Sequence, residues 1–336
     1  DRFGWTSAPV LGLLGAALVA LAIFALVELR AEEPALPLHL FRNSVFLVCS
    51  LVTIVIGVAM FGSVSFIPLF VQGVKGSTAT NSGLVTMPLT LAMATASTLG
   101  GQAIARMGRY RLLTLLGLAI VPLALFMFSR LEQDSPRPQV SLDMVVLGIG
   151  MGLAMPTLTL AVQNALPHRY LGVATSTIQF LRQVGGVMGV AIIGSHINAA
   201  FARELTARLP AEAQTLPPPL LAVIRERDFL LSREALAALE GRFQALGPEG
   251  GALFQQVVEA ARAALSSAIA EGFFLGFAIC LSAVVLGLFL RDVPLRRSHF
   301  PVMAEAEAVH AYADATTPDG QGQRAEGREA AEREES

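Results

Sequence analysis

The stretch FLRQVGGVMGVAIIG, from Phe180 to Gly194, decides the fold class because it combines a membrane-like composition with one charge. It belongs to a longer run, residues 170–195, in which Arg182 is the single charged residue. About 20 apolar residues are enough to cross a bilayer as a helix. A charge at the bilayer centre costs about 2.5–3.5 kcal/mol on insertion scales, so Arg182 is expected to have a structural or functional purpose.

The rest of the chain has the same character. Of its 336 residues, 54% are hydrophobic and 15% are charged, and the mean hydropathy is +0.60. Soluble domains carry about 25% charged residues. Six further uncharged runs of at least 18 residues occur, at residues 3–27, 43–74, 76–105, 112–129, 144–167 and 272–290. We therefore predict seven transmembrane helices.

The basic residues of the short loops predict the orientation of these helices, because cytoplasmic loops carry an excess of Lys and Arg. One set of loops holds nine: Arg30, Arg42, Arg106, Arg109, Arg111, Arg169, Arg291, Arg296 and Arg297. The opposite set holds four: Arg2, Lys75, Arg130 and Arg137. The first set is expected to be cytoplasmic, with the N-terminus of this chain external and its C-terminus inside.

Two segments lie outside the predicted spans. Residues 198–267 have apolar residues at helical spacing between charges, which predicts an external loop that contains amphipathic helices. Residues 298–336 are acidic without apolar periodicity and are expected to be a disordered cytoplasmic tail. A net charge of −2 argues against a nucleic-acid partner.

The last six predicted spans form two triplets, each with two helices that contain polar residues followed by one almost purely apolar helix. Repeated units of three helices have inverted topology, which is a transporter architecture. The pattern predicts an all-α membrane fold made of two inverted three-helix repeats. The third helix of each triplet is expected to face lipid.

Three motifs resemble those of the major facilitator superfamily, in its 14-helix drug/proton antiporter branch (EmrB/QacA type). They are QGVKGSTATNSGLVTMPL at residues 72–89, GQAIARMGRYR at 101–111 and RQVGGVMGVAIIG at 182–194. The resemblance implies a linker transmembrane helix at residues 1–30 and the C-terminal six-helix half of a transporter at 43–291. Its spans are expected near residues 45–71, 79–105, 112–129, 144–166, 170–197 and 268–290.

The resemblance also implies a function, the export of amphipathic small molecules across a bacterial inner membrane. The proton gradient would drive it without a cofactor. The first half of the family's fold is absent from this sequence, and the family's proton-coupling acids lie mainly there. The chain is therefore expected to be incomplete, with the lipid bilayer and the missing N-terminal half as its partners.

Three groups of site residues are predicted. One helical face is expected to act in gating or at the interface with the missing half, with substrate contact as the alternative for Arg182: Arg182, Gln179, Gln183, Gly185, Gly186, Gly189 and Gly194. The cytoplasmic loop motif implied by the resemblance comprises Gly101, Arg106, Gly108, Arg109 and Arg111. A substrate cavity, suited to variable apolar ligands, is expected at Ser50, Thr53, Met60, Phe61, Ser65, Met151, Met155, Thr159 and Gln163.

Other functions stay open. An uptake transporter of the same superfamily is one alternative, and a non-transporting membrane protein derived from half a transporter is another. An enzyme is not expected, because HExxH and GxSxG motifs are lacking and the five histidines are scattered. No catalytic, cofactor-binding or metal-binding residue is predicted. Asp143 and Glu271 are expected at solvated helix ends.

Overall fold

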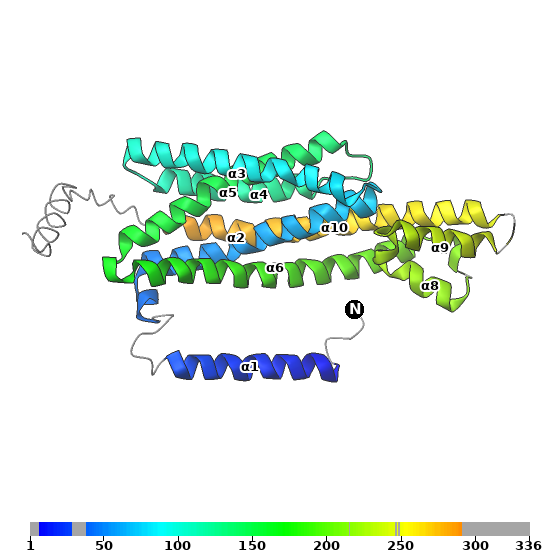
Figure 1. The fold of residues 1–336 in the computed structure, drawn as a ribbon, viewed down its shortest axis with the longest axis horizontal. Coiled ribbons are helices and arrows are strands. Elements are labelled where there is room, and N and C mark those ends of the chain that lie inside the picture. The colour runs from blue at the N-terminus through cyan, green and yellow to red at the C-terminus, as the bar shows by residue number, and fades with distance from the viewer. Residues whose placement is uncertain (1–6, 29–37, 215, 246, 248, 291–336) are drawn as a thin grey trace, which may run out of the picture. The chain divides into compact units, whose positions relative to one another are not determined.

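The computed structural model describes residues 7–28 and 38–290, except residues 215, 246 and 248. Every regular element in these ranges is a helix (Figure 1). Six of the helices are long and apolar enough to cross a membrane. They are α2 (Ser44–Leu69), α3 (Ala79–Met107), α4 (Arg111–Phe128), α5 (Arg137–Ala165), α6 (Leu171–Arg208) and α10 (Gly250–Leu288). The predicted all-α membrane fold is confirmed.

The first predicted span corresponds to α1 (Ala8–Glu28), which is not among the six. Its apolar stretch, Val10–Ala20, is shorter than theirs. The predicted run also includes residues 3–6, which lie outside the described residues. Also outside them are the predicted tail, residues 298–336, and five of the loop cations, Arg2, Arg30, Arg291, Arg296 and Arg297.

Local chemistry fixes the helix ends and ties neighbouring loops together. At the start of α2, the Asn43 side-chain oxygen accepts hydrogen bonds from the backbone N–H groups of Val45 and Phe46, at 2.9 and 3.3 Å. The Asn43 amide also donates to the carbonyl of Ala165 at the end of α5, at 3.2 Å. Gly108 ends α3 with a φ of +69°, a conformation that glycine adopts without strain.

The pairing of the helices agrees with an inverted repeat. Helix α2 packs on α6, and α3 packs on α5. The first triplet is α2, α3 and α4, and the second is α5, α6 and α10. Replacing each helix by its counterpart in the other triplet turns the α2–α6 pair into the α5–α3 pair. Both pairs use glycine for close approach. A Cβ added at Gly57 of α2 would lie 2.9 Å from the backbone nitrogen of Gly186, and one added at Gly148 of α5 would lie 2.8 Å from the Cβ of Ala92.

The exposure of the helices differs from the prediction. The apolar third helices of the triplets, α4 and α10, were expected to be the ones facing outward. In α3, however, 22% of the most apolar stretch is buried, compared with 44% in α4 and 33% in α10. The reason is that α3 packs chiefly on α5, so most of its circumference, including Thr90, Ala94 and Thr98, is uncovered.

Helices α6 and α10 run well beyond the apolar stretches that predicted them. With 38 and 39 residues they are each about 57–58 Å long at 1.5 Å per residue. The hydrocarbon core is about 30 Å thick. Much of the predicted loop 198–267 therefore consists of continuations of these two helices. Residues 198–208 contain Ala, Leu, Arg and Glu, which favour helix, and the helix ends just before Pro210.

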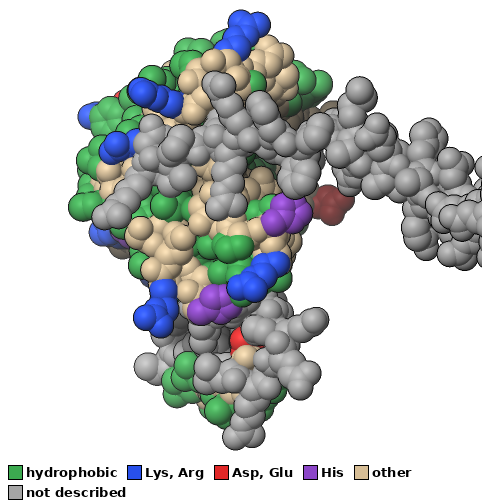
Figure 2. Space-filling view, turned by 90° about the vertical axis from the view of Figure 1, so that its left-hand side faces the viewer, with side chains coloured by type: hydrophobic (Ala, Val, Ile, Leu, Met, Phe, Trp, Pro, Cys, Tyr) green, Lys and Arg blue, Asp and Glu red, His purple; other side chains and the backbone are tan. Residues whose placement is uncertain are grey.

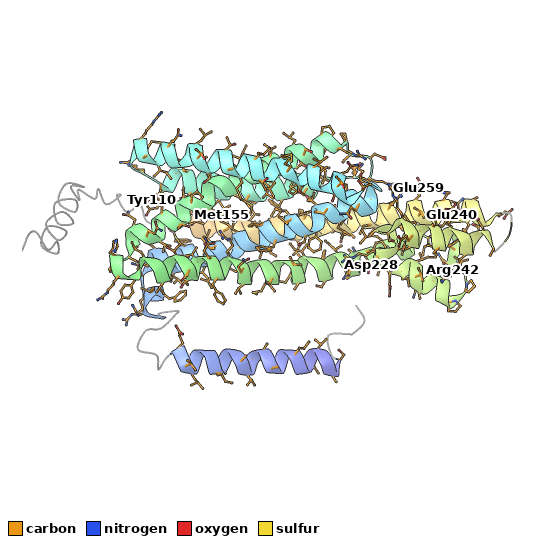
Figure 3. The ribbon with its side chains drawn as sticks, viewed as in Figure 1. Tyr110, Met155, Asp228, Glu240, Arg242 and Glu259 are labelled. Carbon is orange, nitrogen blue, oxygen red and sulfur yellow. The ribbon has the colours of Figure 1, made fainter. Side chains whose placement is uncertain are left out.

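Three short helices connect these continuations: α7 (Ala211–Gln214), α8 (Pro218–Arg225) and α9 (Arg233–Gln244). They lie at one end of the bundle, beside α10 (Figure 1). Phe243 and Phe254 pack together inside this part, with ring centroids 5.7 Å apart. Charged side chains labelled in Figure 3, such as Glu240 and Arg242, lie on the same part. Its small core and charged surface are those of a segment in water.

The two sets of loops that differ in basic residues lie at opposite ends of the six-helix bundle. At one end, Arg111 donates to the carbonyl of Leu288 at 3.1 Å. Lys and Arg side chains gather on this end (Figure 2). At the other end, Arg137 donates to the hydroxyl of Ser77 at 3.0 Å, and Lys75 donates to the carbonyl of Gln133.

Candidate functional site

A row of polar and sulfur-containing side chains runs between α5 and α6. The Arg182 guanidinium lies 3.4 Å from the sulfur of Met155, and the Gln163 amide lies 3.4 Å from the hydroxyl of Thr175. Thr159 lies between Met155 and Gln163 on the same face of α5, at spacings of four residues. All five side chains are partly exposed, and we call them the α5–α6 seam. Met155 is labelled in Figure 3. The structure thus brings together four predicted site residues.

Arg182 keeps most of its hydrogen-bonding capacity in this seam. A guanidinium has five N–H donors, and thioether sulfur is a weak acceptor. Within the described ranges, no carboxylate lies within 4 Å of it. The predicted neighbours are both exposed: Gln179 lies one turn before Arg182, and Gln183 directly follows it. The seam can therefore offer a cation and neutral hydrogen-bonding groups to a solute or to another protein segment.

The glycines near Arg182 have a different partner from the one predicted. A Cβ at Gly185 would lie 2.7 Å from the carbonyl carbon of Ile54, and a Cβ at Gly189 would lie 2.6 Å from the Cα of Val58. Both contacts are with α2. The expectation that these glycines meet a separate half of a transporter is therefore corrected, because α2 of the same chain already occupies their face.

The other two predicted glycines also lie against α2. A Cβ at Gly186 would be 2.7 Å from the Cγ of Phe61, so the ring covers this glycine. A Cβ at Gly194 would be 3.2 Å from the Cζ of Phe66. Gly185, Gly186, Gly189 and Gly194 thus form one packing surface along α2, on which bulky residues have no space.

The remaining residues of the predicted cavity are divided between core and surface. Ser50, Thr53 and Met151 are buried, and the two hydroxyl oxygens have no hydrogen-bond partner. Met60 is partly exposed and Ser65 is exposed. In this structure the first three lie between packed helices rather than on an open surface.

Asp143 is a functional candidate that the sequence analysis missed. Its side chain is 0% exposed, and neither carboxyl oxygen has a hydrogen-bond partner. The expectation of a solvated helix end is wrong, because α5 begins six residues earlier, at Arg137. Pro136 and Pro138 are the signal that could have placed this start, since proline favours the first turn of a helix.

The face of α5 that carries Asp143 is closely packed. It lies seven residues before Gly150, on the same face of α5, and a Cβ at Gly150 would lie 3.0 Å from the backbone nitrogen of Val121 in α4. No cation in the described part of the chain lies within 4 Å of the carboxyl group. An unpaired carboxylate is costly in such a setting.

Glu271 also lies away from the predicted helix end, because α10 begins at Gly250. Its two carboxylate oxygens accept hydrogen bonds from one Arg203 nitrogen, at 2.8 and 2.7 Å. The Nε2 of His196 is 3.6 Å from the same carboxylate. This acid therefore joins α6 to α10 near the point where the helices leave the apolar region.

The residues of the predicted loop motif share one end of the bundle, between α3 and α4. Gly108 provides the turn described above, and the Arg111 guanidinium bonds to the last turn of α10, where the helix dipole favours a cation. Gly101, Arg106 and Arg109 are exposed. The motif thus links the ends of three helices.

A metal centre is not formed by the described residues, which contain no group of three or more His, Cys, Asp or Glu side chains able to hold a metal ion. Cys49 and Cys280 are both buried free thiols. The groups in the described spans that could bind a solute or a proton are therefore the side chains of the α5–α6 seam and the carboxyl of Asp143.

Comparison with known proteins agrees with this architecture. A family model described as Major Facilitator Superfamily matches residues 1–190. The multidrug transporter protein MdtP of Bacillus subtilis is 30% identical over 296 residues, which are 87% of this chain and 54% of that protein. The tetracycline resistance determinant of Streptomyces rimosus is 37% identical over 57% of this chain and 56% of its own length.

A third relative, the tetracenomycin C resistance and export protein of Streptomyces glaucescens, is 33% identical over 57% of this chain and 36% of its own length. Among solved structures, a bacterial homologue of the human lysosomal transporter Spinster, in an inward-facing and unoccupied conformation, matches with a TM-score of 0.52. That match has 17% identity and covers 77% of this chain and 52% of the other. The chain spans about half the length of MdtP. It belongs to the major facilitator superfamily, a family of membrane transporters.

Proposed function

We propose that this chain forms the C-terminal half of a transporter that exports small amphipathic molecules. The observation that carries the proposal is the α5–α6 seam, where the Arg182 guanidinium lies beside Met155 on membrane-length helices and has no carboxylate partner among the described residues. Ionisable residues inside spans are expensive and mark substrate or ion pathways. The names of the relatives, which include multidrug transport and tetracycline resistance, support export rather than uptake.

The proposal includes a second half as partner. The exposed stripe of Thr90, Ala94 and Thr98 on α3 is polar or small, and the exposed Gln179 and Gln183 of α6 are polar, which suits contact with other helices better than with lipid. Large apolar side chains are exposed elsewhere, such as Leu91 and Leu99 of α3 and Leu281 and Val285 of α10, and these would face the bilayer. Together, the two halves would enclose the seam and form the substrate cavity.

Proton coupling is the third part of the proposal. Export against a gradient needs an energy source, and a buried carboxyl that binds and releases a proton can link transport to the proton gradient. Asp143 has the properties of such a group, since it is fully buried and has no hydrogen-bond partner. It would act together with acids of the partner half.

A growth assay tests the efflux function. The complete open reading frame that contains this chain is expressed in a bacterial host that lacks its own drug exporters. It is expected to raise the concentrations of several amphipathic antibiotics needed to stop growth and to lower accumulation of a fluorescent cationic dye. The 336-residue chain alone is expected to insert without giving resistance, because half of the cavity is missing. Increased accumulation would indicate uptake, and resistance from the chain alone would contradict the need for a second half.

The orientation in a bacterial cell membrane is also a proposal, supported by the excess of basic residues in one of the two sets of short loops. Reporters active only in the cytoplasm or only outside it check the topology. A fusion after Arg297 is expected to be active inside, and an insertion near Pro218 is expected to be active outside. Both reporters on one side would contradict the proposed number of spans between them.

A further inference from the structure

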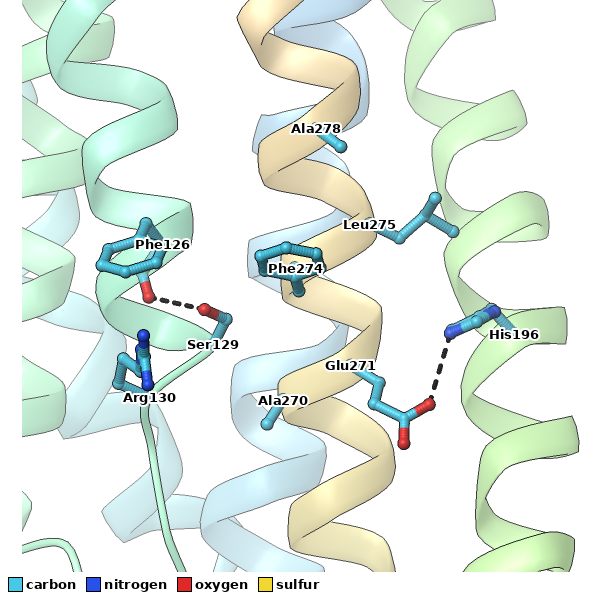
Figure 4. Close-up of a pocket in the computed structure, with 9 residues that line it drawn as sticks. All are labelled: Phe126, Ser129, Arg130, His196, Ala270, Glu271, Phe274, Leu275 and Ala278. Atoms are coloured by element: carbon cyan, nitrogen blue, oxygen red, sulfur yellow. Dashed lines mark hydrogen bonds and ion pairs between the residues drawn. The ribbon is translucent and has the colours of Figure 1, made fainter.

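A groove lies on the outside of the bundle where α4, α6 and α10 meet, away from the α5–α6 seam. It encloses a cavity of about 560 Å³, within the size range of small-molecule sites. Figure 4 shows Arg130 and Phe126 at the end of α4 on one side, His196 of α6 on the other, and Phe274 of α10 between them.

The groove has an apolar part and a polar part. Phe274, Leu275 and Ala278 of α10 line the apolar part, and the exposed side chains of Leu281 and Val285 continue the apolar surface along the helix. The polar part opens into an adjoining cavity of about 530 Å³, which shares four residues with the first. Its lining includes Glu132, Asp134, Glu204 and Arg208. An occupant of both parts must therefore be an amphiphile that lies along the bundle.

Most of the charges around the groove already have partners. Arg203 donates to Glu271 at 2.7 and 2.8 Å, and Arg208 lies 3.0 Å from Glu204. Arg130 differs from them. Its guanidinium carbon lies 5.0 Å from the centre of the Phe126 ring, and within the described ranges no carboxylate is closer than 4 Å to it. Stacking on the ring leaves the N–H donors of Arg130 available.

We infer that this groove binds one phospholipid of the ethanolamine type, with its phosphate at Arg130 and its acyl chains along the apolar part of α10. Arginine matches phosphate because its planar fork donates two parallel hydrogen bonds. Glu132 lines the adjoining cavity two residues further along the loop and is exposed, so its carboxylate can face the lipid ammonium. A cationic amphiphile without a phosphate fits less well, since Arg130 would repel its charge. The inference is independent of the efflux proposal.

Native mass spectrometry of the detergent-purified chain tests this inference. The chain is titrated with phosphatidylethanolamine, with phosphatidylglycerol and with dodecyltrimethylammonium. Wild type is expected to retain one phosphatidylethanolamine at the lowest concentration of the three. Arg130→Ala is expected to weaken this retention about tenfold, the value of one charge-assisted contact. Glu132→Gln is expected to weaken retention of phosphatidylethanolamine and to leave phosphatidylglycerol unchanged.

Arg225→Ala is the matched control, because Arg225 is an exposed arginine of α8 that lines neither cavity. It is expected to retain lipid like wild type. Equal retention by wild type and Arg130→Ala would overturn the inference, as would an equal loss with Arg225→Ala, which would indicate a general charge effect. Tighter retention of dodecyltrimethylammonium than of phosphatidylethanolamine would show that the groove takes a cationic ligand instead.

Discussion

Replacing Gly185 by alanine is expected to separate α2 from α6 and to cause a large loss of folded protein. The added methyl group would overlap the carbonyl oxygen of Ile54 and lie 2.7 Å from its carbonyl carbon. Because both obstacles are backbone atoms, no side-chain rotation relieves the contact, and the helices must move apart. Overpacking typically costs about 1–3 kcal/mol, and a backbone clash belongs at the upper end of that range.

Gly172→Ala provides the matched control within the same helix, since a Cβ at Gly172 would meet nothing within 4 Å. Alanine favours helix over glycine by up to about 1 kcal/mol, so this variant is expected to be as stable as wild type or more so. The measurement is the fraction of each purified variant that stays monodisperse in detergent after heating. Similar curves for Gly185→Ala and Gly172→Ala would contradict the packing found between α2 and α6.

This pair of glycines shows how far the sequence could predict the packing. The spacing of small residues in α6 predicted a close helix contact correctly. It could not identify the partner, because small residues accept any backbone that comes near them. Only the folded arrangement of α2, in which Gly57 lies against the backbone of α6, makes the contact internal to this chain.

The long segment between the last two predicted spans was read less accurately. Hydropathy marks where a helix leaves the apolar region and does not mark where the helix ends. Residues 198–208 are polar enough to be assigned to a loop, yet they continue α6 because their helix propensities are high and no glycine or proline interrupts them. A helix boundary taken from hydropathy alone is therefore too early here.

The same limitation hid Asp143. It directly precedes the apolar run that begins at Met144, so its position in the sequence suggested a helix end in water. The helix actually starts at Arg137, after a proline, so Asp143 lies in its second turn, where it is buried. Local polarity therefore predicted the residue's exposure incorrectly, whereas the backbone signal from proline would have predicted it well.

The second expected result is that efflux by the complete transporter stops when either ionisable side chain of the spans, Asp143 or Arg182, is removed, and that the two losses differ in kind. Asp143→Asn keeps the shape of the side chain but cannot bind and release a proton. It is expected to abolish uphill export and to leave downhill exchange of substrate in place. Arg182→Ala removes the strongest donor of the α5–α6 seam. It is expected to abolish both export and exchange.

The structural reason for the difference is the position of each group. Asp143 is fully buried, so a solute has no access to it and its removal is expected to affect coupling rather than binding. Arg182 is partly exposed beside Met155, where a solute or the partner half can reach it. Arg182→Lys is expected to restore little activity, because a point ammonium does not replace a planar fork of five donors.

Exposed residues with the same charges provide the controls: Asp134→Asn and Arg225→Ala are expected to transport like wild type. Transport is measured in proteoliposomes at equal protein content, with an imposed proton gradient for export and with equal pH on both sides for exchange.

Wild-type export by Asp143→Asn would exclude this carboxyl from coupling. Wild-type exchange by Arg182→Ala would show that the seam does not hold the substrate, and the site would then have to be formed by other residues of α2 and α5. Loss of both activities in Asp143→Asn, with the protein still folded, would instead place Asp143 among the residues that hold the substrate cavity in shape.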